Sequence, residues 1–546
     1  MAKNSTPQTV FDFFLETAKK FPENPALFYK KGHHFEFIPY KRFYNLVGNL
    51  SLSLEKLGVK KGDRVVLISE NRPEWVVSDL SVMSLGAISV PIHNVLSAKQ
   101  YQSIIKETEP KIVIVSNKET LEKVREIKSS LKEAKIIYLD SDLSSSDRKG
   151  WEIYTFIETL QLVPHGGDLG LDTRAENLDP EDILTIIYTS GTTGNFKGVE
   201  LTHKNIVSNI LSVLSVVPVY KTDRFLSILP LSHVFERTVG YYVSVFQGAA
   251  TSYVIDPLKL AEIAAESKPT IIIAVPRLYE KVYEKILEKA NTNIITKTIF
   301  KLAFWYGKGG QKSGFLHRLF DKIVFSKIKN TFGGKVRFFV SGAAPLSSEL
   351  GEFFQTLGMV VLEGYGLTET SPIVSCNRLE SPQFGTVGRP LPGVQVKIAK
   401  DKEILVKGSN VMKGYYKNPF TTKEVFTKDG WFKTGDLGKL ERGGYLRITG
   451  RKKELIVLST GKNVSPTVIE EKLEMSPYVN QVMICGDGKK HIAGIIVPDF
   501  KKIGEKFKIR GKTRICQDQK ILECLKSEFE KILSEFASYE RLKKFV

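Results

Sequence analysis

Residues 183–198 read ILTIIYTSGTTGNFKG, and this stretch decides how the rest of the chain is interpreted. Its apolar, β-branched first half is typical of a buried strand, and its second half is a loop of hydroxyl residues and glycines that leads to Lys197. Glycines let backbone N–H groups converge on an anion, hydroxyls donate further hydrogen bonds, and the lysine supplies positive charge. The Walker pattern GxxxxGK[ST] cannot be laid over the string. The stretch therefore predicts a strand followed by an anion-binding loop of another kind.

Short β-branched runs alternate with helical patterns over most of the chain, which predicts parallel sheets covered by helices. The runs are residues 64–69, 111–116, 135–140, 183–188, 224–229, 270–275 and 336–341. After about Gly385 the strands become shorter and are separated by Gly/Asp turns, so we expect a smaller barrel-like region there. We expect an α/β fold with a large N-terminal domain of residues 1–450 and a small, mobile α+β domain of residues 451–546.

The 546 residues carry a formal net charge of +19, which admits nucleic acid, an anionic membrane or a nucleotide as the partner. No nucleic-acid motif with defined spacing is present, so we expect no nucleic-acid partner. Residues 297–337 hold ten Lys or Arg against one acidic residue, with aromatic residues interleaved. Such a segment is either a helix that lies on anionic lipid, or a core-facing aromatic stripe with a solvated basic back.

Two further features bear on location. No apolar run reaches the length of a transmembrane helix, and the N-terminus lacks the apolar core of a signal peptide. The four cysteines are too scattered for a disulfide framework or a zinc site. We therefore expect a cytoplasmic protein, with peripheral contact at the inner face of the membrane left open.

The loop string resembles the phosphate loop of the adenylate-forming superfamily, which contains acyl-CoA synthetases, luciferases and peptide-synthetase adenylation domains. Two more motifs follow in the family's order: SGAAP (341–345), similar to the segment that lines the adenine pocket, and EGYGLTET (363–370), similar to the central nucleotide motif. In the latter the aromatic residue stacks on adenine, the threonine contacts the α-phosphate and the glutamate holds magnesium, here together with Thr189. The resemblance thus implies an ATP site formed by Thr189, Ser190, Gly191, Thr192, Thr193, Gly194, Lys197, Gly342, Ala343, Ala344, Glu363, Gly364, Tyr365, Gly366 and Thr368, with Glu369 and Thr189 at magnesium.

Three motifs of the C-terminal part complete the resemblance. WFKTGD (431–436) implies that Asp436 binds the ribose hydroxyls, and YLRITGRKK (445–453) implies that Arg451 shares the ribose and that Lys453 is the hinge between domains. STGKNVSP (459–466) is similar to a loop that meets coenzyme A, which assigns Ser459, Gly461 and Lys462 to that substrate.

His233 lies in LSHVFER (231–237). A single histidine is often only structural, but this one occupies the aromatic position that the family places beside the carboxylate and phosphate. Its context resembles bacterial long-chain fatty acyl-CoA synthetases, as do residues 62–75 and 86–100. We therefore assign the catalytic roles to Lys197, His233, Thr368 and Glu369.

The family ends its small domain with a catalytic lysine beyond a segment similar to YERLKKF (539–545), and the sequence in hand ends at Val546. We therefore expect either a fragment or a protein without this lysine, with the adenylation step more affected than thioester formation. The expected function is that of a long-chain fatty acid–CoA ligase, which uses fatty acid, ATP, Mg²⁺ and coenzyme A and holds no tightly bound prosthetic group.

Two alternatives stay open: an acyl–acyl-carrier-protein synthetase, and a non-catalytic acyl- or nucleotide-binding protein. The oligomeric state is also open, a dimer included.

Overall fold

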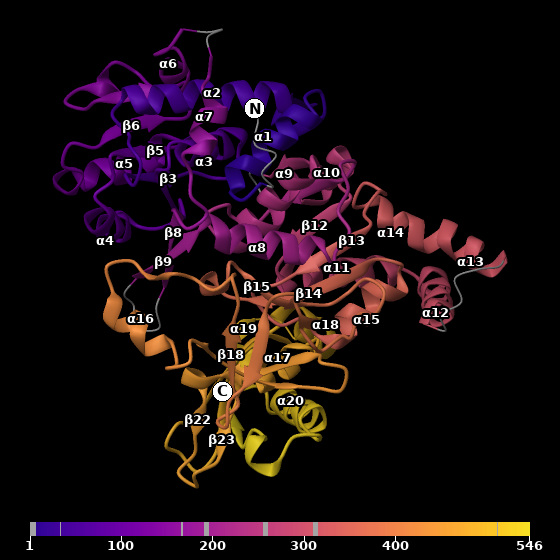
Figure 1. Ribbon diagram of the computed structural model, residues 1–546. Coiled ribbons are helices and arrows are strands. Elements are labelled where there is room, and N and C mark those ends of the chain that lie inside the picture. The colour runs from indigo at the N-terminus through magenta and orange to yellow at the C-terminus, as the bar shows by residue number, and fades with distance from the viewer. Residues whose placement is uncertain are drawn as a thin grey trace. The chain divides into compact units, whose positions relative to one another are not determined.

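The computed structural model describes residues 7–32, 34–164, 168–190, 196–254, 260–308, 315–509 and 511–546. The chain divides into two compact units (Figure 1), and each is described by itself. The first comprises Met1–Gln395 and Val406–Phe432, and the second comprises Val396–Leu405 and Lys433–Val546. Within the described ranges, no helix is both long and apolar enough to cross a membrane.

The first unit contains an eight-stranded sheet that includes the strand predicted within residues 183–198. In spatial order the strands are β19 (Gly414–Tyr415), β9 (Phe196–Thr202), β8 (Ile183–Ser190), β4 (Ile88–Ile92), β3 (Arg64–Ile68), β5 (Ile112–Val115), β6 (Lys135–Tyr138) and β7 (Ile153–Thr155). From β8 to β7 all neighbours are parallel, whereas β9 and β19 pair antiparallel. Every residue of β5 is buried, as is expected for a parallel strand covered on both faces.

A nine-stranded sheet forms the other half of the first unit. Its order is β16 (Arg389–Pro390), β15 (Ile373–Cys376), β14 (Val360–Gly366), β13 (Phe338–Ser341), β12 (Ile271–Ala274), β10 (Arg224–Ser227), β11 (Ala250–Tyr253), β1 (Pro25–Lys31) and β2 (His34–Pro39). The strands from β14 to β1 are parallel, and antiparallel strands lie at both edges. The carboxyl ends of parallel strands are where α/β proteins bind ligands.

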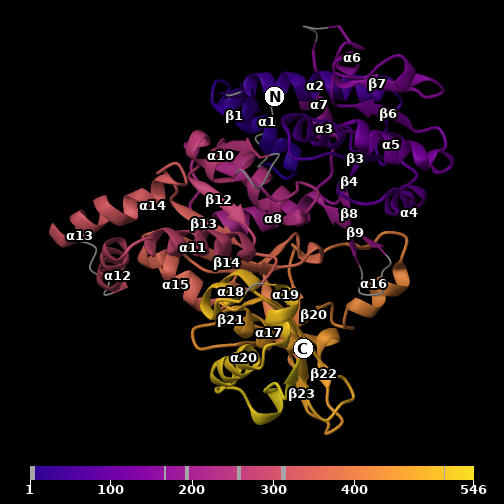
Figure 2. The ribbon, with the colours of Figure 1, turned by 180° about the vertical axis from the view of Figure 1, so that it is seen from behind.

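Helices cover both sheets of the first unit (Figures 1 and 2). They are α1 (Val10–Lys20), α2 (Tyr40–Lys56), α3 (Pro73–Ser84), α4 (Ala98–Thr108), α5 (Lys118–Glu126), α6 (Phe156–Leu160), α7 (Leu171–Glu176), α8 (His203–Leu214), α9 (Val243–Gln247), α10 (Leu260–Ser267), α11 (Pro276–Ala290), α12 (Ile294–Lys308), α13 (Phe315–Phe320), α14 (Ser326–Asn330), α15 (Ser348–Thr356) and α16 (Pro419–Val425). Local signals start several of them. Thr202, for example, accepts a hydrogen bond from the N–H of Asn205 and caps α8.

The second unit is α+β. A four-stranded sheet runs in the order β17 (Gln395–Ile398), β18 (Glu403–Lys407), β20 (Phe432–Leu440) and β21 (Leu446–Arg451), in the region predicted to be barrel-like. Two small sheets follow: β22 (Ile456–Val457) with β23 (Asn463–Val464), and β24 (Val479–Cys485), β25 (Ala493–Pro498) and β26 (Lys544–Phe545). The helices are α17 (Pro466–Glu474), α18 (Phe500–Phe507), α19 (Lys512–Gln517) and α20 (Gln519–Ile532). The predicted α/β class, with parallel sheets in a large N-terminal part and an α+β C-terminal part, is confirmed.

Candidate active site

The β8–β9 hairpin fixes both ends of the predicted phosphate loop. Thr189 lies opposite Lys197 in the antiparallel register, so the two residues are cross-strand neighbours. A Cβ on Gly198 would lie 2.8 Å from the side chain of Ile186 and 3.1 Å from that of Tyr188, so this position requires a glycine. The predicted loop residues Gly191, Thr192, Thr193 and Gly194 lie outside the described residues, and Ser190 is described only in its backbone. The hairpin therefore presents Thr189 and Lys197 together at the carboxyl end of β8.

The structure brings Glu369 to the same hairpin through a residue that the sequence did not single out. Tyr415 on β19 pairs with Val199 on β9, and its hydroxyl donates a hydrogen bond of 2.8 Å to Oε1 of Glu369. The ammonium of Lys197 lies 5.2 Å from the centroid of the Tyr415 ring. Burial, and then the nearby carboxylate, raise the pKa of Tyr415, so its hydroxyl stays protonated and donates. Lys197, Tyr415 and Glu369 thus form one contact group.

The EGYGLTET segment is held in place by its backbone. It begins on β14 and turns into the 3-10 helix Thr368–Thr370. A Cβ on Gly366 would lie 1.9 Å from a backbone carbonyl oxygen of the returning chain, so no other residue fits without a shift. The carbonyl of Glu369 accepts a hydrogen bond of 2.8 Å from a backbone N–H. Tyr365, Thr368 and Glu369 are each partly exposed, as contact with a ligand requires.

The SGAAP segment follows β13, which runs parallel to β14 with Ser341 opposite Glu363. Oε1 of the buried Glu363 accepts a hydrogen bond of 3.1 Å from the N–H of Leu346, directly after the SGAAP segment. This hydrogen bond holds the end of the segment in place. Ala343, in the left-handed conformation with φ 68°, and Ala344 are exposed at its tip. The predicted residues Gly342, Ala343 and Ala344 therefore lie beside the strand that leads into Gly364, Tyr365 and Gly366.

His233 lies at the carboxyl end of β10, in the loop that precedes a π-helix, Glu236–Tyr242. Its ring packs edge-on against His93, with 5.4 Å between centroids and an interplanar angle of 85°. Burial of the ring, and then the neighbouring His93, lower the pKa of His233, so the imidazole is neutral near pH 7. Two residues further on, the ring of Phe235 would lie 2.9 Å from a Cβ on Gly342, which places the His233 loop against the SGAAP segment.

A buried polar cluster holds this π-helix to the eight-stranded sheet. Arg237 forms an ion pair with Asp79 of α3, and both side chains are almost fully buried. Arg237 also donates 2.7 Å hydrogen bonds to the hydroxyls of Tyr242 and of Thr185 on β8. Since Thr185 belongs to the strand that carries the phosphate loop, the cluster couples the position of the His233 loop to that of β8.

The donors of the first unit fit a magnesium ion that accompanies a nucleotide. Magnesium prefers oxygen ligands and completes its shell with phosphate and water oxygens. One carboxylate oxygen of Glu369 accepts a hydrogen bond from Tyr415, and the Thr189 hydroxyl belongs to the neighbouring hairpin. The carboxylate of Glu369 and the hydroxyl of Thr189 are oxygen ligands of the kind that magnesium prefers.

In the second unit the predicted ribose residues meet. Asp436 on β20 lies opposite Arg451 on β21, and Nε of Arg451 is 3.3 Å from Oδ1 of Asp436. Asp436 is almost buried, whereas the Arg451 side chain is largely exposed. Lys453 lies in the 3-10 helix Lys452–Glu454 directly after β21. Lys452 anchors this helix, because its ammonium lies 2.9 Å from the Glu403 carboxylate.

The predicted coenzyme A loop connects β22 to β23. Ser459 donates its N–H to the carbonyl of Lys489 at 2.9 Å, and Gly461 takes the left-handed conformation, with φ 75°. The ammonium of Lys462 lies 5.5 Å from the centroid of the Tyr539 ring. Ser459, Gly461 and Lys462 are exposed, so the loop is open to a ligand.

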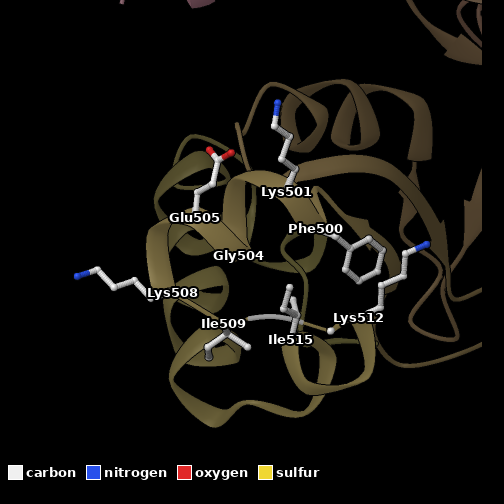
Figure 3. Close-up of a pocket in the computed structure, with 9 residues that line it drawn as sticks. Phe500, Lys501, Gly504, Glu505, Lys508, Ile509, Lys512 and Ile515 are labelled. Carbon is white, nitrogen blue, oxygen red and sulfur yellow. The ribbon is translucent and has the colours of Figure 1, made fainter. Parts of the chain in front are cut away.

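A hollow of about 620 Å³ lies elsewhere in the second unit, between α18 and α19. Phe500, Ile509 and Ile515 line it, and Figure 3 shows the lysine side chains of its rim spreading outward from it. None of its lining residues was predicted to bind a substrate. Since no polar side chains converge on it, the hollow lacks the arrangement of a reaction site.

Comparison with known proteins identifies the family. Residues 14–416 match the AMP-binding enzyme family, and residues 453–544 match the C-terminal domain of AMP-binding enzymes. The long-chain-fatty-acid–CoA ligase FadD15 of Mycobacterium bovis is 37% identical over 83% of this chain and 76% of its own length. Long-chain-fatty-acid–CoA ligase 5 of Rattus norvegicus is 32% identical over 99% of this chain and 83% of its own.

A chloroplastic long-chain-fatty-acid–[acyl-carrier-protein] ligase of Arabidopsis thaliana, AEE15, is 30% identical over 91% of this chain and 77% of its own. Among solved structures, the anthranilate CoA ligase AuaEII in complex with anthranoyl-AMP superposes with a TM-score of 0.76 at 20% identity, covering 100% of this chain and 94% of that one. At such identity the superposition shows the fold alone. The chain belongs to the AMP-binding enzymes of the adenylate-forming superfamily and is an AMP-forming acid–thiol ligase related to fatty acyl-CoA synthetases.

Proposed function

We propose that the protein is a long-chain fatty acid–CoA ligase. In the first half-reaction the fatty carboxylate attacks the α-phosphorus of ATP, forming acyl-AMP and releasing pyrophosphate. In the second, the thiol of coenzyme A attacks the acyl carbon and AMP leaves. The observation that carries the proposal is the contact group of Lys197, Tyr415 and Glu369 beside the predicted phosphate loop, in a chain 37% identical to FadD15.

The contact group suits phosphoryl chemistry, in which positioning and charge stabilisation provide most of the catalysis. The ammonium of Lys197 supplies positive charge to the phosphates from the end of the hairpin. The hydroxyl of Tyr415 fixes the Glu369 carboxylate through one oxygen, which leaves the other oxygen for a metal. Magnesium bound with ATP supplies neutralising charge on the departing pyrophosphate. We propose that Thr368 contacts the α-phosphate and that Ser190, Gly191, Thr192, Thr193 and Gly194 complete the loop.

The two flanking segments would bind the reacting carboxylate and the base. A neutral imidazole at His233 can orient the carboxylate by hydrogen bonding without adding a charge that would hold the carboxylate back from attack. We assign the adenine to the Tyr365 ring and to Gly342, Ala343 and Ala344, whose backbone the Glu363 carboxylate braces.

The second unit would contribute the remaining contacts. The Asp436 carboxylate is an acceptor for the two ribose hydroxyls, and the paired Arg451 is a donor beside it. Lys453, in the 3-10 helix that follows β21, is the proposed hinge between a domain of residues 1–450 and one of residues 451–546. Ser459, Gly461 and Lys462 are the proposed coenzyme A contacts.

ATP–pyrophosphate exchange in the presence of fatty acids of graded chain length tests the first half-reaction. Lys197→Ala should lower exchange by roughly 10²-fold, the usual effect of losing one charged donor to a transition state. Lys204→Ala is the matched control, because Lys204 is exposed and forms an ion pair with Glu181 on the surface. Normal exchange by Lys197→Ala would refute the loop assignment. Nucleotide binding without any exchange in the unaltered chain would favour the non-catalytic alternative.

The identity to AEE15 makes acyl carrier protein a second candidate acceptor. An acidic carrier would be attracted by a chain with a formal net charge of +19. Transfer from preformed acyl-AMP, with coenzyme A or acyl carrier protein as the sole acceptor, separates the two. Faster transfer to the carrier protein would replace the coenzyme A assignment.

A further inference from the structure

Helix α12 presents apolar side chains to solvent along one stripe. Ile294, Leu302 and Trp305 follow one another at spacings of a helical face, and their exposed fractions are 83%, 52% and 76%. Ile295, 71% exposed, lies at the edge of the same stripe. Scattered single apolar residues on a surface need no explanation, but a contiguous exposed patch marks an interaction site.

The opposite face of α12 is anchored to the first unit, so the exposed stripe belongs to a packed helix. Ala303 is fully buried in the core, and Phe304 stacks on Phe353 of α15 with 5.4 Å between ring centroids. Phe300 packs on the same ring at 6.4 Å. The helix therefore has two apolar faces, one of which contacts the core while the other contacts water.

The segment that follows α12 extends the exposed apolar surface. Helix α13 lies beside α12 in both views (Figures 1 and 2), and Tyr306 and Phe320 join the two with 5.6 Å between their ring centroids. Leu319 and Ile323, at the end of α13 and in the π-helix Asp321–Phe325, are 40% and 38% exposed. The exposed apolar residues of these joined elements are here called the α12–α13 surface: Ile294, Ile295, Leu302, Trp305, Leu319 and Ile323.

Basic side chains flank these apolar residues. Lys301 is exposed on α12 in the same row as Ile294 and Trp305, and Lys297 is exposed beside that row. Arg318 and Lys322 are exposed on the neighbouring segment. Residues 297–337 as a whole hold ten basic residues and one acidic residue. Exposed apolar side chains with lysines among and beside them suit a helix that lies in the interface of an anionic bilayer, where the apolar groups enter the headgroup region and the flexible lysine side chains reach lipid phosphates.

Other occupants fit this chemistry less well. A symmetric contact with a second copy would bring two basic surfaces together, and like charges at an interface are unfavourable. Nucleic acid would pair with the lysines but would leave an aliphatic stripe without a partner. We propose that the α12–α13 surface docks the protein on an anionic lipid membrane. The proposal stands on this surface alone and does not depend on the reaction proposed above.

Vesicle binding by the full chain tests the proposal. Co-sedimentation with phosphatidylcholine vesicles that contain phosphatidylglycerol should be strong at low salt, and it should be weak with phosphatidylcholine alone. The double variant Lys297→Gln/Lys301→Gln should lose roughly 30-fold in affinity, which follows from the usual contribution of two lysines near an anionic surface. Leu302→Glu/Trp305→Glu should abolish binding. Phe420→Glu is the matched control, since Phe420 is 74% exposed on α16 and should tolerate the change.

Trp305 also provides a spectroscopic readout. It is the one exposed tryptophan among the chain's four, because Trp75 is buried and Trp151 and Trp431 are half-buried. Its emission should shift to the blue when anionic vesicles are added, and Trp305→Phe should bind while losing the shift. Equal binding to neutral vesicles, unchanged binding by the Leu302→Glu/Trp305→Glu variant, or a fall in oligomeric state of that variant without any vesicle effect would overturn the proposal.

Discussion

Glu236→Gln should remove a pH dependence from the stability of the first unit. Glu236 is fully buried at the start of the π-helix, and the described neighbour that favours its ionised form is the side chain of Ser227, through a hydrogen bond that only partly offsets burial. Gly240 faces it so closely that an added Cβ would lie 2.3 Å from Oε1. Burial raises the pKa of Glu236 from its ordinary 4.5 to about 8, so the folded protein holds this carboxyl protonated at neutral pH.

The magnitude follows from linkage. In the unfolded chain the carboxyl ionises near pH 4.5, whereas in the folded chain it ionises near pH 8, so folding takes up a proton between these values. The stabilisation is complete below pH 4.5 and is lost as the pH rises through the folded pKa. A change from 4.5 to about 8 corresponds to roughly 5 kcal/mol of unfolding free energy. Glutamine resembles the protonated acid in shape and cannot ionise, so the variant should lack this loss.

Urea denaturation followed by circular dichroism, at about pH 5.5 and about pH 8.5, measures the effect. The stability of Glu236→Gln relative to the unaltered chain should rise between the two pH values by about 3 kcal/mol, the part of the full effect that falls within this window. Glu16→Gln is the control, because Glu16 is exposed on α1 and should follow the unaltered chain. The reasoning fails if Glu236→Gln shows the same pH dependence as the unaltered chain. It also fails if the variant is strongly destabilised at both pH values, which would mean that a charged, paired carboxylate is needed.

Two further substitutions test the candidate site. Tyr415→Phe removes the hydroxyl that fixes Glu369, so pyrophosphate exchange should fall about tenfold or more and should need a higher magnesium concentration. The control Tyr416→Phe should change neither the exchange rate nor the magnesium requirement. If Tyr415→Phe shows the magnesium dependence of the unaltered chain, Tyr415 does not act on the metal site. Gly366→Ala places a Cβ within 1.9 Å of a backbone carbonyl oxygen and should lower the melting temperature by several degrees. Gly364→Ala is the control, because its Cβ would have its nearest contact at 3.7 Å and should leave the melting temperature unchanged. Equal melting temperatures for the two variants would mean that the backbone at Gly366 shifts at little cost.

The strands were predictable because buried parallel strands impose a local sequence pattern. Residues 112–115 read IVIV and form β5, where all four side chains are buried. The strand that leads into the predicted phosphate loop was predictable for the same reason, since an apolar run must end where the chain turns through glycines. Both signals lie within a few consecutive residues, so no knowledge of the tertiary structure was needed.

Tyr415 could not be predicted, because its role arises from strand pairing between distant segments. It is 46 residues from Glu369, and only the register of β19 on β9 brings it to that carboxylate. The function of Glu363 was equally hidden. A glutamate next to a nucleotide motif can accept a hydrogen bond from a ligand or from the protein, and the structure shows one carboxylate oxygen accepting from the backbone of Leu346.

From the sequence alone, the positive net charge of the chain is compatible with several classes of partner. In the structure, the side chains that surround each lysine indicate which kind of anion that lysine suits. Lys197 lies over the Tyr415 ring, at the end of the β8–β9 hairpin, and Tyr415 is hydrogen-bonded to the Glu369 carboxylate. The charge of Lys197 is therefore suited to one small anion in a fixed position. Lys297 and Lys301 stand exposed beside an apolar stripe, where a diffuse anionic surface satisfies both the charge and the hydrophobic groups. The net charge therefore does not indicate one polyanionic partner. Part of it belongs to the proposed phosphate site and part to the surface proposed to meet lipid, and the aromatic and aliphatic neighbours of each lysine distinguish the two.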